Sequence, residues 1–310
     1  MDITRIIAEV EKVIVGKRHV IEKILTAILA NGHILLDDVP GIGKTTLALA
    51  LSRSLGLTFG RIQCTPDVLP SDIVGFSMYN KAADSFTYKA GIVTGVHLLL
   101  ADEINRTSSK TQSALLEAME EKQVTVDGES HSLRNPFIVF ATQNNVGTAG
   151  TQLLPYAQLD RFLVKLSIGY PNRESEMEVI RGRQRENPID NITQICTVED
   201  VVRMQNDVQS ITVHDRIIDY IARLAQHSRN HALLELGISP RGSLFVNKMA
   251  KAWAYMQNRG YVIPEDVQAI YKDTCAHRLL PGAKARMEKL SNAQILQTLL
   301  SEVAVPDGLT

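Results

Sequence analysis

The sequence predicts an α/β domain, with a parallel sheet flanked by helices, followed by a smaller domain made of helices alone. Short apolar runs that suit buried strands alternate with helical patterns up to about residue 170, as in a parallel sheet. Beyond that residue only helical patterns occur, and Pro171 and the loop over residues 187–196 mark a hinge. We therefore expect domains over residues 1–186 and 187–310.

The predicted strands are runs of a few apolar residues. The first covers residues 33–36, and it is followed by a loop that ends at Thr45 and by a helix over residues 46–55. A strand, a glycine-containing loop and a helix in this order open a parallel α/β unit. Further strands are expected over residues 59–64, 96–100, 137–141 and 162–168.

Helices are predicted where apolar residues recur three and four positions apart. The expected helices cover residues 3–12, 18–30, 109–122, 172–186, 197–209, 213–230, 240–258, 264–280 and 285–303. Two stretches, residues 76–93 and 123–134, interrupt the alternation of strands and helices, and both are predicted to be hairpins. In the second, Asp127-Gly128 between alternating residues is a strong turn signal.

The composition is that of an ordinary soluble protein of 310 residues, with 45% hydrophobic and 22% charged residues. A formal net charge of −1 provides no overall basic field for nucleic acid. Cys64, Cys196 and Cys275 lie far apart, which favours buried thiols over a disulfide framework or a zinc site. The N-terminus has an amphipathic helical pattern, and no apolar run approaches the roughly 20 residues that span a bilayer. We expect a cytoplasmic protein without membrane insertion.

The loop after the first strand has the composition of a phosphate-binding loop. Its glycines let the backbone wrap closely around a phosphate, and the following helix points N–H groups at the same place. Lys44 would reach the β- and γ-phosphates, and the Thr45 hydroxyl would ligate Mg²⁺. The one departure from the G-x-x-x-x-G-K-[ST] pattern is Asp38, where glycine is usual. The residues expected to bind the nucleotide are Val39, Pro40, Gly41, Ile42, Gly43, Lys44, Thr45 and Thr46.

Two carboxylates follow the strand that begins at Val96. They are Asp102 and Glu103, and ligands of parallel sheets bind beyond the carboxyl ends of the strands. Asp102 is therefore predicted to hold Mg²⁺, directly or through water, beside the phosphate loop. Glu103 is predicted to orient and polarise the attacking water.

Several longer strings are more specific than a phosphate loop. They are RIQCTPDVLPSDIVG, ADEINR, KTQSALLEAMEEKQVTVDG, ATQN, LPYAQLDRF and SPRGS. With these strings the chain resembles the MoxR family of AAA+ ATPases over nearly its whole length, most densely from about residue 31 to 171. The resemblance implies a P-loop AAA+ domain followed by a helical lid domain. It also implies that residues 76–93 are the helix-2 insert and that residues 123–134 are the hairpin before sensor 1.

The resemblance extends to further site residues. It implies that Asn144 is sensor 1, which positions water against the γ-phosphate, and that Arg161 is the arginine finger offered to a neighbouring subunit. Arg241 matches sensor 2, and the local sequence agrees, because Ser239 suits an N-cap and Pro240 the first helical position. Val15-Gly16 matches the element that lines the adenine site, although a simple helix–helix turn explains these two residues almost equally well.

Three residues depart from the family pattern between sensor 1 and the finger. Asn145 stands where proline is usual, Gly147 where an acidic residue is usual, and Tyr156 where glutamate is usual. Because of these departures, the family pattern does not predict the details of the subunit interface or how the protein responds to a client.

The resemblance implies a Mg-ATP-hydrolysing ring, most often a hexamer, that remodels or matures a protein client in a chaperone-like role. A partner with a von Willebrand factor A domain is implied as well. The alternative is a nucleic-acid motor of the helicase kind, against which the net charge of −1 and the 5% aromatic content argue. A nucleotide-dependent scaffold without hydrolysis is a third hypothesis, against which Lys44, Asp102, Glu103 and Arg161 argue.

Two histidines in the predicted helical domain are candidates for metal ligands. His227 and His231 are four residues apart, a spacing that can place two imidazoles on one helix face. No third ligand is evident in the sequence, so no metal site is predicted there.

Overall fold

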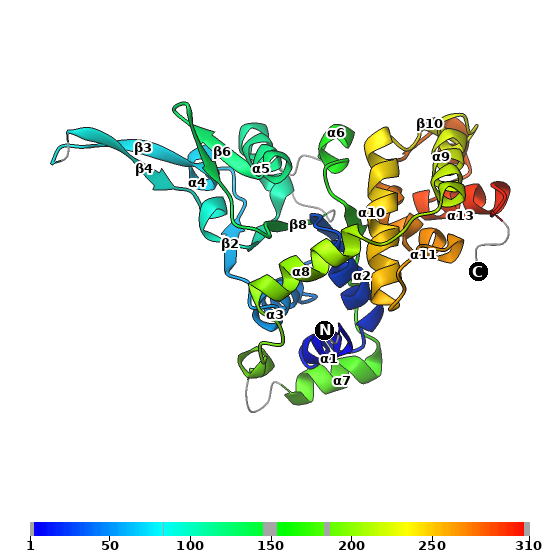
Figure 1. Cartoon of the computed structure of the whole chain (residues 1–310), viewed down its shortest axis with the longest axis horizontal. Coiled ribbons are helices and arrows are strands. Elements are labelled where there is room, and N and C mark those ends of the chain that lie inside the picture. The colour runs from blue at the N-terminus through cyan, green and yellow to red at the C-terminus, as the bar shows by residue number, and fades with distance from the viewer. Residues whose placement is uncertain (1–2, 83, 145–153, 183–186, 307–310) are drawn as a thin grey trace. The chain divides into compact units, whose positions relative to one another are not determined.

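The computed structural model describes residues 3–82, 84–144, 154–182 and 187–306 (Figure 1). The chain forms two compact units that alternate along the sequence. The first consists of Met1–Glu22, His33–Leu154 and Leu166–Val202, and the second of Lys23–Gly32, Pro155–Lys165 and Arg203–Thr310. These interleaved units do not test the single predicted boundary between residues 186 and 187, which stays a prediction.

A five-stranded sheet is built from the predicted strands. Its order is β2 (Phe59–Gln63), β5 (Leu98–Asp102), β8 (Ile138–Gln143), β1 (Ile34–Asp37) and β9 (Val164–Leu166). The pairs β2–β5, β5–β8 and β8–β1 are parallel, which confirms the predicted fold class. All six residues of β8 are buried, as expected for a strand covered on both faces. The carboxyl ends of β1, β5 and β8 therefore lie at one edge.

The helices of the first unit bury their apolar positions. In α1 the buried positions include Ile6, Ile7 and Val10, which recur at helical spacing. Helices α2 and α8 contain residues of both units. The bounds are α1 (Ile3–Glu11), α2 (Arg18–Leu29), α3 (Lys44–Ser54), α4 (Pro70–Val74), η1 (Ile92–Gly95), η2 (Ile104–Arg106), α5 (Ser109–Glu121), α7 (Arg173–Gly182), η3 (Pro188–Asn191) and α8 (Val198–Gln209).

Both predicted hairpins are present. The first pairs β3 (Gly75–Asn80) with β4 (Ser85–Ala90), and it extends away from α4 and α5 in Figure 1. The second pairs β6 (Gln123–Val126) with β7 (Glu129–Ser132). Its turn has positive φ at both central residues, 51° at Asp127 and 85° at Gly128, as the Asp-Gly signal predicts. The ring of Tyr88 in β4 stacks on that of His131 in β7 at 3.7 Å between centroids, which joins the two hairpins.

The second unit is mainly helical. It contains α6 (Tyr156–Leu159), α9 (Asp215–Arg229), α10 (Pro240–Met256), α11 (Pro264–Cys275), η4 (Ala276–Arg278), α12 (Ala283–Met287) and α13 (Asn292–Glu302). It also has one short ladder, β10 (Leu234–Leu236) with β11 (Leu280–Pro281), which an all-helical prediction did not include. These strands are too short to produce a recognisable alternation in the sequence.

The predicted helix over residues 285–303 is wrong as a single element. The chain leaves the helical conformation at Lys289, whose φ is 54°. A new helix, α13, then begins behind the N-cap Ser291, whose Oγ accepts a hydrogen bond from the Gln294 N–H at 3.3 Å. Ser291 and Gln294 form a capping box, a signal that is present in the sequence.

Cys64, Cys196 and Cys275 are buried, as predicted. Burial raises the pKa of Cys64 and of Cys275 to about 12, so both are neutral thiols at physiological pH. Within the described ranges, none of the helices combines the length and the apolar character that crossing a bilayer requires.

Candidate nucleotide site

The phosphate loop joins β1 to α3. Gly41 and Gly43 have φ values of 84° and 94°, in the left-handed region that favours glycine. Gly43 is the N-cap residue of α3, and Lys44 is the first residue of that helix. The amino end of α3, with its unpaired N–H groups, therefore faces the turn of the loop, which suits a bound anion.

Asp38, the departure from the loop pattern, has a structural role. Its carboxylate accepts hydrogen bonds from the Ser167 hydroxyl at 2.8 Å and from the backbone N–H groups of Ile168 and Gly169. Glycine could not make these bonds. Asp38 thus ties the first residue of the phosphate loop to the segment that follows β9.

Lys44 is held in a polar network at the edge of the sheet. Its side chain is buried, and Nζ donates to the Asp38 carbonyl oxygen and to Asn144 Oδ1, each at 2.8 Å. Burial lowers the pKa of Lys44, and the nearby carboxylates of Asp38 and Asp102 oppose that shift. A buried ammonium of this kind gains stabilisation from any anion that the loop binds.

Asp102 is the last residue of β5. Its Oδ1 accepts a hydrogen bond from Thr142 Oγ1 at 2.6 Å, and its Oδ2 accepts one from Arg61 Nη2 at 2.8 Å. Thr142 also accepts the backbone N–H of Glu103 at 2.9 Å, so one hydroxyl fixes both acidic positions. Neither Thr142 nor Arg61 was predicted to belong to the site, although Thr142 is part of the ATQN string.

Glu103 leaves the strand with a φ of 56°, in the left-handed region. Both oxygens of the Glu103 carboxylate accept hydrogen bonds. Oε1 accepts one from Asn144 Nδ2 at 2.6 Å, and Oε2 accepts one from Arg106 Nη1 at 2.7 Å. Asn144 therefore bridges Lys44 and Glu103 through one amide. The structure brings together Lys44, Asp102, Glu103 and Asn144, and it adds Arg106, which sequence reasoning missed.

A cavity of about 310 Å³ opens beside the phosphate loop. Its wall includes Val15, one of the two residues expected to line the adenine site, and Tyr170 and Ile180, which were not predicted. Gly16 contributes by its lack of a side chain, because a Cβ there would lie 2.3 Å from Ser175 Oγ at the start of α7. The predicted loop residues that line this cavity are Pro40, Gly41, Ile42, Gly43 and Thr46. Its apolar walls suit a flat ring.

The donor set beside the cavity fits Mg²⁺. Magnesium prefers hard oxygen ligands and keeps several waters. Asp102 offers a partly buried carboxylate, and Thr45, the second residue of α3, offers a hydroxyl one residue from Lys44. Val39, at the start of the loop, is half-buried and does not line the cavity.

Comparison with known proteins agrees with this geometry. Residues 33–164 match the model of the ATPase family associated with various cellular activities, and residues 226–299 match the AAA lid domain. The chain is 38% identical to Chaperone MoxR1 of Mycobacterium tuberculosis, over 97% of this chain and 82% of that protein. The chain belongs to the MoxR family of AAA+ ATPases.

Two further proteins match over nearly the whole chain. The protein YeaC of Bacillus subtilis, itself uncharacterised, is 46% identical over 97% of this chain and 93% of its own length. A crystal structure of a candidate ATPase from Cytophaga hutchinsonii superposes with a TM-score of 0.90 at 39% identity, covering 98% of this chain and 95% of that one. The AAA+ core and the lid domain of the fold prediction are thus confirmed.

The two arginines that the MoxR resemblance implied belong to the second unit. Arg241 is the second residue of α10, behind the predicted N-cap Ser239, whose Oγ accepts the Gly242 N–H at 3.0 Å. Arg161 follows α6 and donates to the Ala157 carbonyl oxygen at 3.2 Å. The roles of both arginines stay predictions.

The segment that carries Arg161 is held by a buried arginine that sequence reasoning missed. Arg278 donates from Nη2 to the carbonyl oxygens of Phe162, at 2.6 Å, and Asp160, at 3.2 Å. Its Nε also pairs with Asp160 Oδ1 at 2.9 Å. Burial lowers the pKa of Arg278, while Asp160 opposes that shift. The backbone on both sides of Arg161 is therefore anchored by one guanidinium.

Of the three departures from the family pattern, Asn145 and Gly147 lie outside the described residues. Tyr156 is the first residue of α6, and its side chain is exposed.

Proposed function

We propose that this chain binds Mg-ATP at the phosphate loop and hydrolyses it. One observation carries the proposal. At the edge of the sheet, where the phosphate loop ends and α3 begins, Lys44 donates a hydrogen bond to Asn144, and Asn144 donates one to Glu103. A cation, an amide and a carboxylate in contact are the groups that phosphoryl transfer to water needs.

Each residue has a distinct task in this proposal. The loop amides and Lys44 bind the β- and γ-phosphates, and the walls around Val15 hold the base. Thr45 and Asp102 would hold Mg²⁺, which supplies charge neutralisation on the phosphates when it is bound. Glu103 accepts a hydrogen bond from the attacking water and polarises it. Asn144 holds the Glu103 carboxylate and the Lys44 ammonium in fixed positions through its two hydrogen bonds.

Two further arginines, Arg161 and Arg241, are proposed to interact with the negative charge of the phosphates once the subunits have assembled. We expect Arg161 to reach the γ-phosphate of a neighbouring subunit and Arg241 to sense the phosphates from the lid, so that activity requires a ring, most often a hexamer. The anchoring of residues 160 and 162 by Arg278 supports this role, because a finger works only from a rigid mount.

The ring can be tested by kinetics. ATPase activity per chain should rise with protein concentration and then reach a plateau. Arg161→Ala should remove most of the activity at every concentration while Mg-ATP binding is retained. Activity that is independent of concentration and unaffected by Arg161→Ala would contradict the shared site.

The output of hydrolysis is proposed to be remodelling or maturation of a protein in the cytoplasm, aided by a partner with a von Willebrand factor A domain. The name of the MoxR1 relative, a chaperone, supports this role. Phe86 in the β3–β4 hairpin is 74% exposed and Phe76 is 49% exposed, as suits contact with another protein. A pull-down with Glu103→Gln and ATP should enrich client and partner relative to Lys44→Ala.

The alternative, a nucleic-acid motor, is less well supported, because the formal net charge is −1. A salt-sensitive gel shift with single- or double-stranded DNA would favour it.

A further inference from the structure

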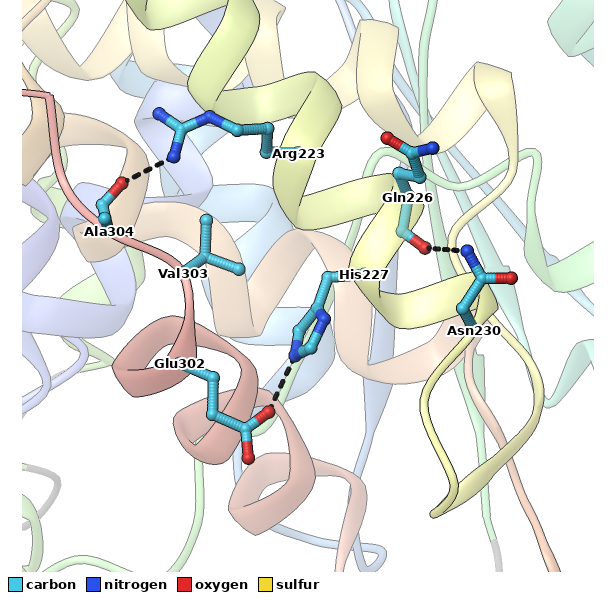
Figure 2. Close-up of a pocket in the computed structure, with 7 residues that line it drawn as sticks. All are labelled: Arg223, Gln226, His227, Asn230, Glu302, Val303 and Ala304. Carbon is cyan, nitrogen blue, oxygen red and sulfur yellow. Dashed lines mark hydrogen bonds and ion pairs between the residues drawn. The ribbon is translucent and has the colours of Figure 1, made fainter.

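The end of α13 meets the end of α9 at a cluster of two histidines and one glutamate. His227 lies in the last turn of α9, His231 follows that helix, and Glu302 is the last residue of α13. Glu302 Oε2 lies 2.7 Å from His227 Nε2 and 3.2 Å from His231 Nε2. Figure 2 shows the His227 ring pointing directly at the Glu302 carboxylate. The third ligand that the sequence did not reveal is thus 75 residues from His227.

The three side chains offer a metal ion a compact set of donors. One ligand atom from each of His227, His231 and Glu302 lies within 4.8 Å of the other two. A tetrahedral zinc ion with bonds of about 2.1 Å requires neighbouring ligand atoms about 3.4 Å apart. The His231–Glu302 distance of 3.2 Å is already close to that value, and the His227–Glu302 distance of 2.7 Å would have to lengthen by roughly 0.7 Å. Two imidazoles and one carboxylate are also a donor set that zinc sites use.

The surroundings leave room for a fourth ligand. A cavity of about 390 Å³ borders the cluster and is lined by His227 and Glu302, so water can reach an ion there. Arg223, which also lines this cavity, donates to the Ala304 carbonyl oxygen at 2.9 Å, and Figure 2 shows its guanidinium turned toward that atom. Arg223 also pairs with the Asp219 carboxylate at 2.8 Å, which compensates its charge.

We propose that His227, His231 and Glu302 bind a borderline divalent cation of the zinc type, which fastens the end of α13 to α9. The ion would replace the protons that now bridge both rings to Glu302. His231 must also give up the hydrogen bond that its Nδ1 accepts from the Leu233 N–H at 3.2 Å, because an imidazole that ligates through Nε2 carries its proton on Nδ1. This site is separate from the phosphate loop and does not depend on ATP hydrolysis.

The test uses the untagged full-length chain with excess Mg²⁺ present to occupy hard oxygen sites. Titration with Zn²⁺ followed by calorimetry should give one ion per chain. Binding should also raise the melting temperature by linkage. Co²⁺ in its place should give the intense visible absorption of a tetrahedral ion. His231→Ala and Glu302→Gln should each weaken Zn²⁺ binding by at least about 10-fold and abolish the rise in melting temperature.

His19→Ala is the matched control, since His19 is an exposed histidine on α2, and it should bind Zn²⁺ as the wild type does. Glu302→Gln keeps the side-chain size, so a circular dichroism melt without metal shows whether the fold is retained. Zn²⁺ affinity unchanged in both Glu302→Gln and His231→Ala would overturn the proposal, as would a wild-type chain that binds no Zn²⁺.

Discussion

Two charged clusters of this protein differ in how their charges are compensated. At the end of the phosphate loop, Lys44, Asp102 and Glu103 are linked by hydrogen bonds through the Asn144 amide and the Thr142 hydroxyl. Other residues of the same loop line a cavity. In the second unit, the buried Arg278 donates hydrogen bonds to backbone carbonyl oxygens and forms an ion pair with the Asp160 carboxylate. The first cluster can accept a ligand, whereas the second can only hold the chain.

A buried cation can belong either to a binding site or to a structural anchor. Both clusters contain buried cations whose pKa is lowered by burial, namely Lys44 and Arg278. A shifted pKa alone therefore does not identify the site. The position of the first cluster, at the carboxyl ends of β5 and β8 and next to the phosphate loop, does identify it. Substitutions in the first cluster should change catalysis with little effect on stability, whereas substitutions in the second should lower stability.

The largest effect is expected from Lys44→Ala. Loss of the ammonium removes the main positive charge at the phosphates, so ATPase activity should fall by at least about 100-fold. The rise in melting temperature with Mg-ATP should vanish, while the melting temperature without ligand stays close to that of the wild type. Lys110→Ala, at an exposed lysine of α5, should leave both quantities unchanged. An intact ligand-induced rise in Lys44→Ala would refute the assigned role.

Arg278→Ala tests the anchor. It leaves Asp160 and two carbonyl groups without their buried donor, so the second unit should lose about 3 kcal/mol of stability, measured by chemical denaturation. Arg286→Ala removes an exposed pair with Glu235, 3.5 Å apart, and should change stability by less than about 1 kcal/mol. Equal effects of the two substitutions would show that the buried network is not an anchor.

Arg106→Ala tests the positioning of Glu103. Arg106 contacts the carboxylate, so its loss should lower kcat by about 10-fold and leave the affinity for Mg-ATP unchanged. Arg106→Lys should recover part of the rate, because it retains a donor and a charge. A change confined to KM would instead place Arg106 among the groups that bind the nucleotide.

The smallest effect concerns pH. His277 is buried beside Arg278 and bonds to the Phe162 carbonyl oxygen at 3.0 Å, and burial holds its pKa well below the usual 6.5. The unfolded chain therefore takes up a proton that the folded chain refuses, and stability is lost as pH falls below about 6.5. Each further pH unit should remove up to about 1.4 kcal/mol. The melting temperature of His277→Gln should fall less between pH 7 and pH 5 than that of the wild type.

The nucleotide site could be predicted because its residues form local strings. Lys44 and Thr45 follow a glycine loop, and Asp102 and Glu103 end a strand, so sequence spacing determines where they meet. Arg106 could have been found, since it completes the string ADEINR. The function of Asp38 could not, because its partners Ser167, Ile168 and Gly169 are about 130 residues away.

The second unit was predicted less completely for the same reason. Arg278 contacts Asp160 across 118 residues, and no local pattern announces such a pair. The break between α12 and α13 was readable in principle, since Ser291 and Gln294 are a capping signal. Contacts between residues far apart in the sequence depend on the tertiary fold, whereas helix caps and strand ends depend on residues that are neighbours in the sequence.

Glu103→Gln provides the most direct measurement of the central claim, that the Lys44–Asn144–Glu103 chain is a hydrolytic site. Mg-ATP binding and ATP turnover should be measured on the same preparation, with Glu121→Gln, an exposed glutamate of α5, as the control. Glu103→Gln should bind Mg-ATP within about 3-fold of the wild type, while its turnover should fall by at least about 100-fold. Turnover at the wild-type rate in Glu103→Gln would contradict the claim.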